Sequence, residues 1–423
     1  MAAQESTPVA TPGTTPAATP VAAPGDRPDL AAMALVRDEL PAGYRQRLFD
    51  NEGYTPADRF AAIQRGDTVP SAEILATGIG WFYSSTFQSA DDRYFIDVYL
   101  SEFADEAAVG AGFDYFEDEA RWAETGQTSR DEPGPAAGSA PKETTVGSFA
   151  KPFGVWAVQS YVDTTFRVGR VLAGVGMYAV GVAPAPEATL VEELSETLAG
   201  RIEMVLAGQA PPGIDLALPS RVLPLFAAWS WPGNSLEGHK DAEEFLGTSG
   251  APAEFAAGYL SGYAVFASTG SAPPLLQHDP PYLDVAVARF ATPTDALGVL
   301  AVAERLLQRH DGRPITRTEA AEPALAGVDA ARAFRSERLP TDSPDSLYLN
   351  GAEVVLVTGS ALIMVSVLVD ADDPTMTVER AEAIALDLAT QQVECLRADG
   401  PCGPVRTPAA LETNATPVAV RET

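Results

Sequence analysis

The chain has 423 residues, of which 46% are hydrophobic and 20% charged, so it can bury a sizeable core and is long enough for two or three domains. Its 58 acidic residues outnumber 28 basic ones and give a formal net charge of −30, which makes nucleic acid a poor partner. No stretch reaches the roughly 18 consecutive apolar residues that a membrane helix needs, so we expect no transmembrane segment.

The two ends of the chain are expected to be disordered tails, over 1–27 and 400–423. Both are rich in Pro, Thr and Ala and hold few large apolar side chains to offset the entropy of ordering. A complete signal peptide is not visible, but Ala2-Ala3-Gln4 resembles the small-residue end of one, and the spacer over 7–25 is common after one in exported bacterial proteins. We therefore expect an extracellular or cell-envelope location.

A first module is predicted over 28–208. It opens with strands over 80–87 and 94–103, followed by an amphipathic helix over 105–122. The segment 123–150 is rich in Gly, Pro and Ser, and we expect a long loop there that is either disordered or part of a binding surface.

The rest of the first module is predicted to be three strands and a closing helix. The strands are expected over 155–162, 166–175 and 177–182, with Gly169, Gly174 and Gly176 marking turns or bulges. Apolar residues from Val191 to Val205 recur at helical spacing, and Gly208 stands where the C-cap of that helix belongs.

A second module is predicted over 216–399, after a linker over 209–215. It has a strand pair over 258–268 and 282–290, and a helix with Thr292 as N-cap and Pro293 at its first position. Three more strands are expected over 331–339, 346–357 and 361–369. Asp373-Pro374 is expected to start the last helix.

Several residues of the first module recur in the second, about 183 to 190 residues later. Leu35, Leu40 and Pro41 recur as Leu218, Leu223 and Pro224, and Ile96-Asp97-Val98 and Phe103 recur as Leu283-Asp284-Val285 and Phe290. Self-similarity at a fixed distance marks a structural unit that is used twice. The sequence therefore predicts an α+β protein of two tandem homologous domains. Each would be a mostly antiparallel sheet covered by two main helices, in the order ββαβββα, around its own hydrophobic core.

The only two cysteines, Cys395 and Cys402, follow the last predicted helix. Gly400-Pro401 between them predicts a turn, and a disulfide across so small a loop would contribute roughly 2.5 kcal/mol. A redox or zinc pair is the alternative, but the spacing fits neither site. A disulfide favours an oxidising compartment.

No catalytic residue, metal site or cofactor is expected from the motifs. The three histidines, His239, His278 and His310, have no partner at zinc spacing, and the sequence holds neither a GxSxG elbow nor a GxxxxGK[ST] loop. An extracytoplasmic hydrolase with its site between the modules is the main alternative function. A Ser or Asp beside one of these histidines in a cleft would favour it.

The candidate ligand-binding residues are aromatic and acidic: Trp81, Tyr83, Tyr99, Asp97 and Asp284. Core packing is the ordinary role of strand aromatics. Alternation along the strand nevertheless places Tyr99 on the other face of the sheet from Ile96 and Val98. If no helix covers that face, Tyr99 could line an apolar groove there. Asp97 and Asp284 occupy matched positions. They would either fix the sheet edge by hydrogen bonding or contact a ligand in each copy.

The order of elements also carries a resemblance. The chain resembles uncharacterised secreted proteins of Chloroflexi-type bacteria in having a strand, a helix with the pattern Phe-Ala-x-x-x-Ala (residues 103–108), an apolar hairpin and a terminal amphipathic helix. Those proteins share the Thr-Pro-Ala tails and a Leu-Pro-Ala-Gly-Tyr-like segment, here residues 40–44. More distantly, the chain is similar to actinobacterial extracytoplasmic sensor domains and lipoproteins, whose paired disulfides it lacks.

We therefore predict a non-catalytic exported protein that binds a small apolar ligand or a cell-envelope partner. Besides the hydrolase, a structural or adhesive surface protein is a further alternative, and exposed aromatic patches without concavity would point to it.

Overall fold

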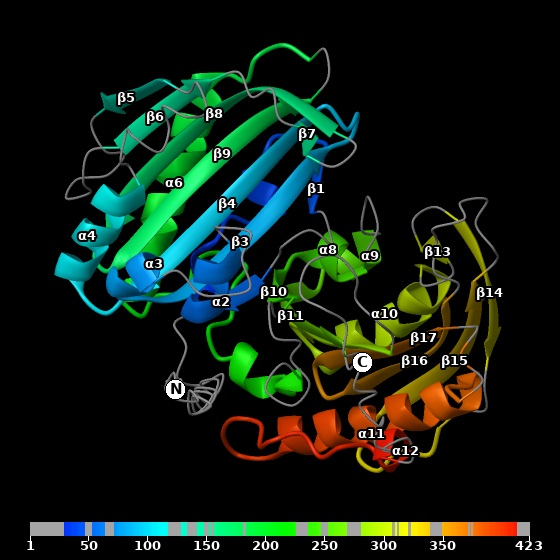
Figure 1. The fold of residues 1–423 in the computed structure, drawn as a ribbon. Coiled ribbons are helices and arrows are strands. Elements are labelled where there is room, and N and C mark those ends of the chain that lie inside the picture. The colour runs from blue at the N-terminus through cyan, green and yellow to red at the C-terminus, as the bar shows by residue number, and fades with distance from the viewer. Residues whose placement is uncertain are drawn as a thin grey trace, which may run out of the picture.

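The computed structural model describes residues 29–46, 53–63, 72–116, 128–132, 142–147, 152–153, 156–180, 183–225, 236–246, 253–268, 281–306, 309–310, 313–319, 323–338, 349–370, 373 and 375–412. The predicted tail over 1–27 and His278 lie outside these residues. The described chain forms two antiparallel sheets with helices packed on them, which confirms the predicted α+β class (Figure 1).

Sheet 1 has the strand order β1-β3-β4-β9-β8-β6-β5, with β2 paired to β3 and β7 paired to β8. Its strands are β1 (Tyr44–Gln46), β2 (Gly53–Pro56), β3 (Ile79–Ser89), β4 (Tyr94–Phe103), β5 (Thr128–Glu132), β6 (Lys142–Gly147), β7 (Pro152–Phe153), β8 (Trp156–Val168) and β9 (Val171–Val180).

Sheet 2 has the order β10-β11-β12-β17-β16-β15-β14-β13. Its strands are β10 (Leu236–Lys240), β11 (Tyr259–Ser268), β12 (Tyr282–Phe290), β13 (Arg309–His310), β14 (Arg313–Glu319), β15 (Ala330–Arg338), β16 (Leu349–Thr358) and β17 (Ala361–Asp370).

The described helices are mostly short. The four longest are α4 (Glu106–Phe116), α6 (Ala188–Leu206), α10 (Pro293–Leu306) and α11 (Val378–Arg397). The others are α1 (Leu30–Met33), η2 (Arg37–Glu39), α2 (Ala57–Ile63), α3 (Ala72–Ala76), η3 (Pro219–Arg221), α8 (Ala242–Leu246), α9 (Ala253–Ala256) and α12 (Ala409–Glu412). No helix in the described ranges combines the length and the hydropathy that crossing a membrane requires.

The two sheets place corresponding strands in the same order. β3-β4-β9-β8-β6-β5 in sheet 1 corresponds to β11-β12-β17-β16-β15-β14 in sheet 2. The first long helix follows the second strand of each series, since α4 comes after β4 and α10 after β12. The last long helix follows the central strand that is last in chain order, since α6 comes after β9 and α11 after β17. Both sheets hold more strands than the outline ββαβββα predicts. We call the parts before and after residue 209 the first and second halves.

Two features of the first half differ from the sequence prediction. The segment 123–150, predicted as a loop, contains β5 and β6, whose polar sequences lack the apolar alternation that predicts a strand. The three strands predicted over 155–182 are two, because the chain turns at Gly169, whose φ is +55°. Gly174 and Gly176, predicted as turns or bulges, lie inside β9.

The helix termini follow from capping chemistry. In α10 the amide of Asp295 donates to Thr292 Oγ1 over 3.1 Å, so the predicted N-cap is confirmed. The start predicted for the last helix is wrong: Asp373 closes a turn with Thr375, and α11 begins after Thr377, whose hydroxyl accepts from the amide of Arg380.

Residues 400–412 are ordered along α11, although the sequence predicts a disordered tail from 400. The predicted disulfide joins Cys395 to Cys402. Beyond it, the amide of Arg406 donates to Gln391 Oε1 over 2.8 Å, and Leu411 packs on the core. The disulfide and these contacts hold the segment to the helix.

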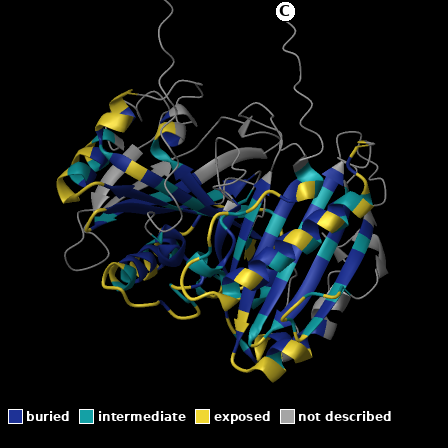
Figure 2. Ribbon diagram, turned by 90° about the horizontal axis from the view of Figure 1, so that it is seen from below, coloured by how far each residue is buried: buried dark blue, intermediate teal, exposed yellow. Residues whose placement is uncertain are grey.

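Helices lie on both faces of each sheet. In sheet 1, α6 covers the face of Ile96 and Val98, and α4 covers one end of the opposite face, at Phe103. In sheet 2, α11 and α10 lie on opposite faces in the same way. The strands are therefore largely buried, as Figure 2 shows in dark blue.

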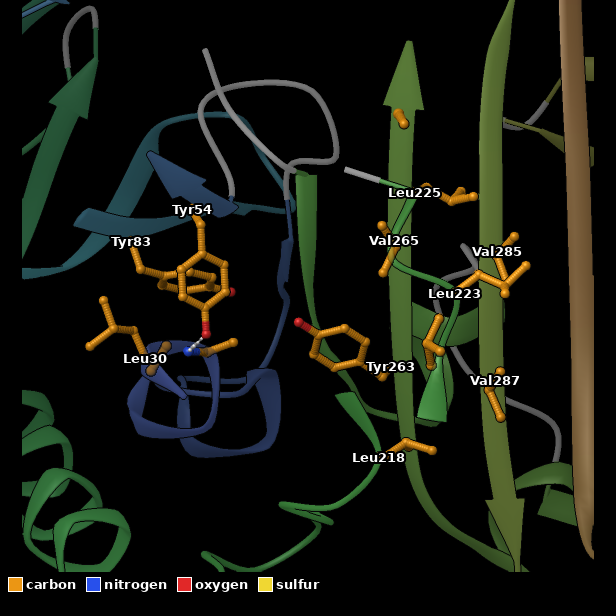
Figure 3. Packing of buried hydrophobic residues seen from close by; sticks show 14 of the residues in the cluster. Leu30, Tyr54, Tyr83, Leu218, Leu223, Leu225, Tyr263, Val265, Val285 and Val287 are labelled. Carbon is orange, nitrogen blue, oxygen red and sulfur yellow. Dashed lines mark hydrogen bonds between the residues drawn. The ribbon is translucent and has the colours of Figure 1, made fainter. Parts of the chain in front are cut away.

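One cluster of contacting buried residues runs through both halves, which corrects the prediction of two separate cores. It joins the α6 side of sheet 1 to the α11 side of sheet 2 through α1 and the segment from Leu218 to Leu225. Figure 3 shows this passage, with Leu30 and Tyr54 of the first half near Tyr263 of the second. Two smaller clusters lie under α4 and under α10.

Candidate functional site

The face of sheet 1 that carries α4 at one end becomes polar and aromatic beyond the helix. Asp97 and Tyr99 point to this face, because they alternate along β4 with the buried Ile96, Val98 and Leu100. The strand register then decides which side chains of β9 and β8 lie beside them. Asp97 is opposite Gly176, and Gly176 is opposite Asp163.

A second row follows one step closer to α4. It runs from Tyr99 through Gly174 to Thr165. The Tyr99 hydroxyl lies 2.6 Å from Thr165 Oγ1 and donates to Asp163 Oδ2 over 3.1 Å. Tyr99 therefore reaches across β9 and ties β4 to β8 through side chains.

Two glycines make room for the tyrosine rings. A Cβ atom on Gly174 would overlap the ring of Tyr99, and one on Gly176 would stand 2.8 Å from the Tyr178 hydroxyl oxygen. Tyr178 also stacks on Tyr161, with ring centroids 5.8 Å apart. We call Asp97, Tyr99, Asp163, Thr165 and Tyr178 the tyrosine–aspartate face.

The electrostatics keep the phenols protonated. Burial raises the pKa of Tyr99 and of Tyr178 well above 10, and the negative charge of Asp163 raises both further. The pKa of Tyr161 is raised for the same two reasons. At neutral pH these side chains are neutral hydrogen-bond donors with flat apolar rings, and they are not bases.

The second half repeats the acidic row without the tyrosines. Asp284 is opposite Ser366, and Ser366 is opposite Glu353, so two carboxylates again flank a small residue on the central strand. At the positions matching Tyr99 and Gly174 stand Ala286 and Met364, which belong to or pack on the apolar cluster under α10. Phe266, opposite Asp284, stacks on Tyr282. Only the first half therefore combines the row with hydroxyl-bearing rings in these positions.

The predicted ligand-binding residues are divided between two faces. Trp81 and Tyr83 lie in the core on the α6 side, 9% and 2% exposed, with their rings edge-on to Tyr54. The Tyr54 hydroxyl accepts a hydrogen bond from the amide of Ala31 (Figure 3). Asp97 and Tyr99 lie together on the opposite face, and Asp284 lies on β12 of the second half.

Asp163, Thr165 and Tyr178 are not among the site residues that the sequence predicts. Asp163 and Thr165 lie inside β8, between the strands predicted over 155–162 and 166–175, so the prediction left out the positions that decide their face. Their position beside Tyr99 depends on the register between β4, β9 and β8, which a single sequence does not carry.

An Asp beside a histidine between the halves is the arrangement that would favour the hydrolase alternative. His239 Nε2 lies 3.4 Å from Asp29 Oδ2. The His239 side chain is 1% exposed, however, and the other Asp29 oxygen accepts from the amide of Ala32 as the N-cap of α1. A substrate could not reach the imidazole in this arrangement. The side chain of His310 lies outside the described residues, like His278.

The comparisons give limited information. A scan of protein-family models finds no match, and a search of curated proteins finds none. Among solved structures the chain is similar to the extracellular domain of PknH from Mycobacterium tuberculosis, at 9% identity and a TM-score of 0.25, over 38% of this chain and 83% of that one. Similarity this low shows neither a shared fold nor a shared function.

The resemblance to actinobacterial extracytoplasmic sensor domains and lipoproteins therefore stays a prediction. The resemblance to secreted proteins of Chloroflexi-type bacteria has no support in these comparisons.

Proposed function

We propose that the protein is an exported, non-catalytic binding protein whose ligand contacts the tyrosine–aspartate face. The observation that carries the proposal is the placement of Tyr99 and Tyr178 over glycine backbone, beside Asp163. Four of the five side chains, all but Thr165, keep part of their surface accessible. Polar groups in the middle of a sheet are costly unless hydrogen bonds or a ligand satisfy them.

The ligand chemistry follows from the groups on this face. Carboxylate oxygens accept hydrogen bonds, and tyrosine rings stack on apolar or planar surfaces. We therefore expect a small molecule with an apolar or ring-shaped side and hydrogen-bond donors at its edge. This refines the wholly apolar ligand that the sequence predicts.

Export is supported by the disulfide between Cys395 and Cys402. Structural disulfides persist in oxidising compartments and are rare in the cytosol. The Pro, Thr and Ala spacer over 7–25 agrees with this proposal.

Native mass spectrometry of the protein purified from its source tests the proposal. We expect a retained small molecule on the wild-type chain and its loss from Tyr99→Ala and Asp163→Asn. The matched control is Glu353→Gln, which changes the equivalent carboxylate of the second half. Retention of the same molecule by the first two variants would place the ligand elsewhere.

A ligand could be lost during purification, and a thermal-shift screen with defined amines, sugars and aromatic acids tests for binding in that case. The proposal expects compounds that raise the melting temperature of the wild type and of Glu353→Gln but not of Tyr99→Ala. If no molecule is retained and no compound separates these variants, the proposal fails. A co-purifying envelope protein that tolerates Tyr99→Ala would favour the partner-binding alternative.

A further inference from the structure

The two halves meet where α1 and β2 of the first half lie against β10 of the second. β2 and β10 belong to different sheets, so no strand ladder joins the halves there. Polar contacts cross the junction at His239, Lys240 and Arg37. His239 Nε2 faces Asp29, Lys240 Nζ donates to Gln46 Oε1 over 2.8 Å, and Arg37 pairs with Glu243.

His239 is the most deeply buried group of these contacts. Its ring packs edge-on against Tyr263, with centroids 5.0 Å apart. Its Nδ1 atom is buried and makes no hydrogen bond within the described part of the chain. A neutral imidazole that donates Nε2–H to Asp29 leaves Nδ1 as a bare acceptor.

We propose that protonation of His239 loosens the junction between the halves and makes it sensitive to pH. A second proton would place a charged Nδ1–H donor in a buried position without an acceptor, which is costly. Asp29 offsets part of this cost. Its oxygen is 3.4 Å away, whereas charge-assisted N–H···O bonds are about 2.7–2.9 Å long, and its side chain is 21% exposed. Opening the junction would let water solvate both N–H groups.

The charged and titratable groups around His239 act in both directions. Asp29, the N-cap of α1, faces the imidazole, and Tyr263 of β11 packs on its ring. Glu237 and Lys240 lie on β10 itself, and Glu243 of α8 pairs with Arg37 at the same junction. The carboxylates favour an imidazolium, and Arg37 and Lys240 oppose it. The missing acceptor at Nδ1 decides the balance between the two.

Hydrogen exchange of the full chain, followed by mass spectrometry, tests this inference. Samples at pH 7.5, 6.5 and 5.5 bracket the ordinary histidine range, and exchange times are scaled to the intrinsic rate. Peptides over 29–46 and 236–246 should exchange several-fold faster at pH 5.5. Peptides over 349–370, from the centre of sheet 2, should not change.

Two variants distinguish the protonation of His239 from other effects of low pH on the junction. His239→Gln keeps a donor but does not titrate, so the acid response of both junction peptides should disappear. Asp29→Asn keeps a capping side chain but removes the offsetting charge, so the response should grow. Equal wild-type exchange at the three pH values, the same response in His239→Gln, or a weaker response in Asp29→Asn would overturn the inference. It does not depend on the proposed ligand.

Discussion

The ring of Tyr99 occupies the space that a side chain at Gly174 would need. Because β9 has no side chain at that point, the tyrosine can cross the strand and bring its hydroxyl to Thr165 on β8. A glycine inside a strand ordinarily weakens it. Here its absence of a side chain allows one polar residue to connect three strands.

Gly174→Ala should therefore displace the Tyr99 ring and break its hydrogen bonds. We expect a loss of about 1–3 kcal/mol in the free energy of unfolding, the usual cost of overpacking a filled site. Chemical denaturation gives the value. Gly200→Ala is the matched control, because a Cβ atom there meets nothing within 4 Å and alanine is a better helix former by up to about 1 kcal/mol. Equal stability of Gly174→Ala and wild type would show that the close approach does not fix the ring.

The sequence predicts the central elements because their apolar patterns are strong. β4, β11 and β12 lie within about two residues of the predicted bounds, and α10 begins at the predicted Pro293. β5 and β6 could not be found in this way, since their sequences Thr128–Glu132 and Lys142–Gly147 are polar and gain their place only by pairing with β8 and with each other. The site is similarly divided: the face of Tyr99 follows from alternation, but its partners on β8 follow from register.

The sequence also did not predict that the two halves share one continuous core. Leu30, Leu218 and Leu223 read as ordinary apolar residues near the start of each module. Only the folded chain shows that they fill the passage between the two sheets. Residues that recur in the two modules predict similar helices and strands. They do not determine whether the two modules bury their apolar faces in separate cores or in one shared core.

Stability at alkaline pH should depend on Tyr44, whose pKa is raised to about 12, mainly by burial and further by Tyr94 and Asp91. An unfolded tyrosine loses its proton near pH 10, so the unfolded state gains stability first as the pH rises. The folded state should therefore lose stability between about pH 10 and 12. Urea denaturation at pH 8, 10 and 11 should show a smaller loss for Tyr44→Phe than for the wild type. Parallel losses in the two proteins would mean that Tyr44 contributes nothing to the alkaline response.

Reduction of the disulfide should destabilise the end of the second half. Cys402→Ser, or wild type in reductant, is expected to lose roughly 2–3 kcal/mol, because the closed loop between Cys395 and Cys402 no longer restricts the unfolded chain. Melting temperatures with and without reductant measure this. Cys402→Ser itself should be insensitive to reductant, and peptides over 400–412 should lose exchange protection before those of sheet 1. An unchanged melting temperature on reduction would contradict the expectation.

Arg201 and Gln392 fasten the leading segment of each half to its last long helix. Arg201 on α6 is 3% exposed and donates to the Ala32 carbonyl over 2.8 Å and to Glu39 over 2.9 Å. Gln392 on α11 is fully buried, accepts from the amide of Leu223 over 2.9 Å and donates to the Arg221 carbonyl over 2.8 Å.

Arg201→Met should cost about 3–5 kcal/mol, since it removes the ion-pair partner of Glu39 and the donor to the buried Ala32 carbonyl. Gln392→Leu should cost about 1–3 kcal/mol, because the groups it abandons are uncharged. Denaturant titration of both variants, beside Thr197→Ala on the exposed side of α6 as control, tests the ranking. Since the two segments fill one shared core, each variant should lower the stability of the whole chain in one transition. Separate transitions for the two halves would show that the shared core does not couple their unfolding.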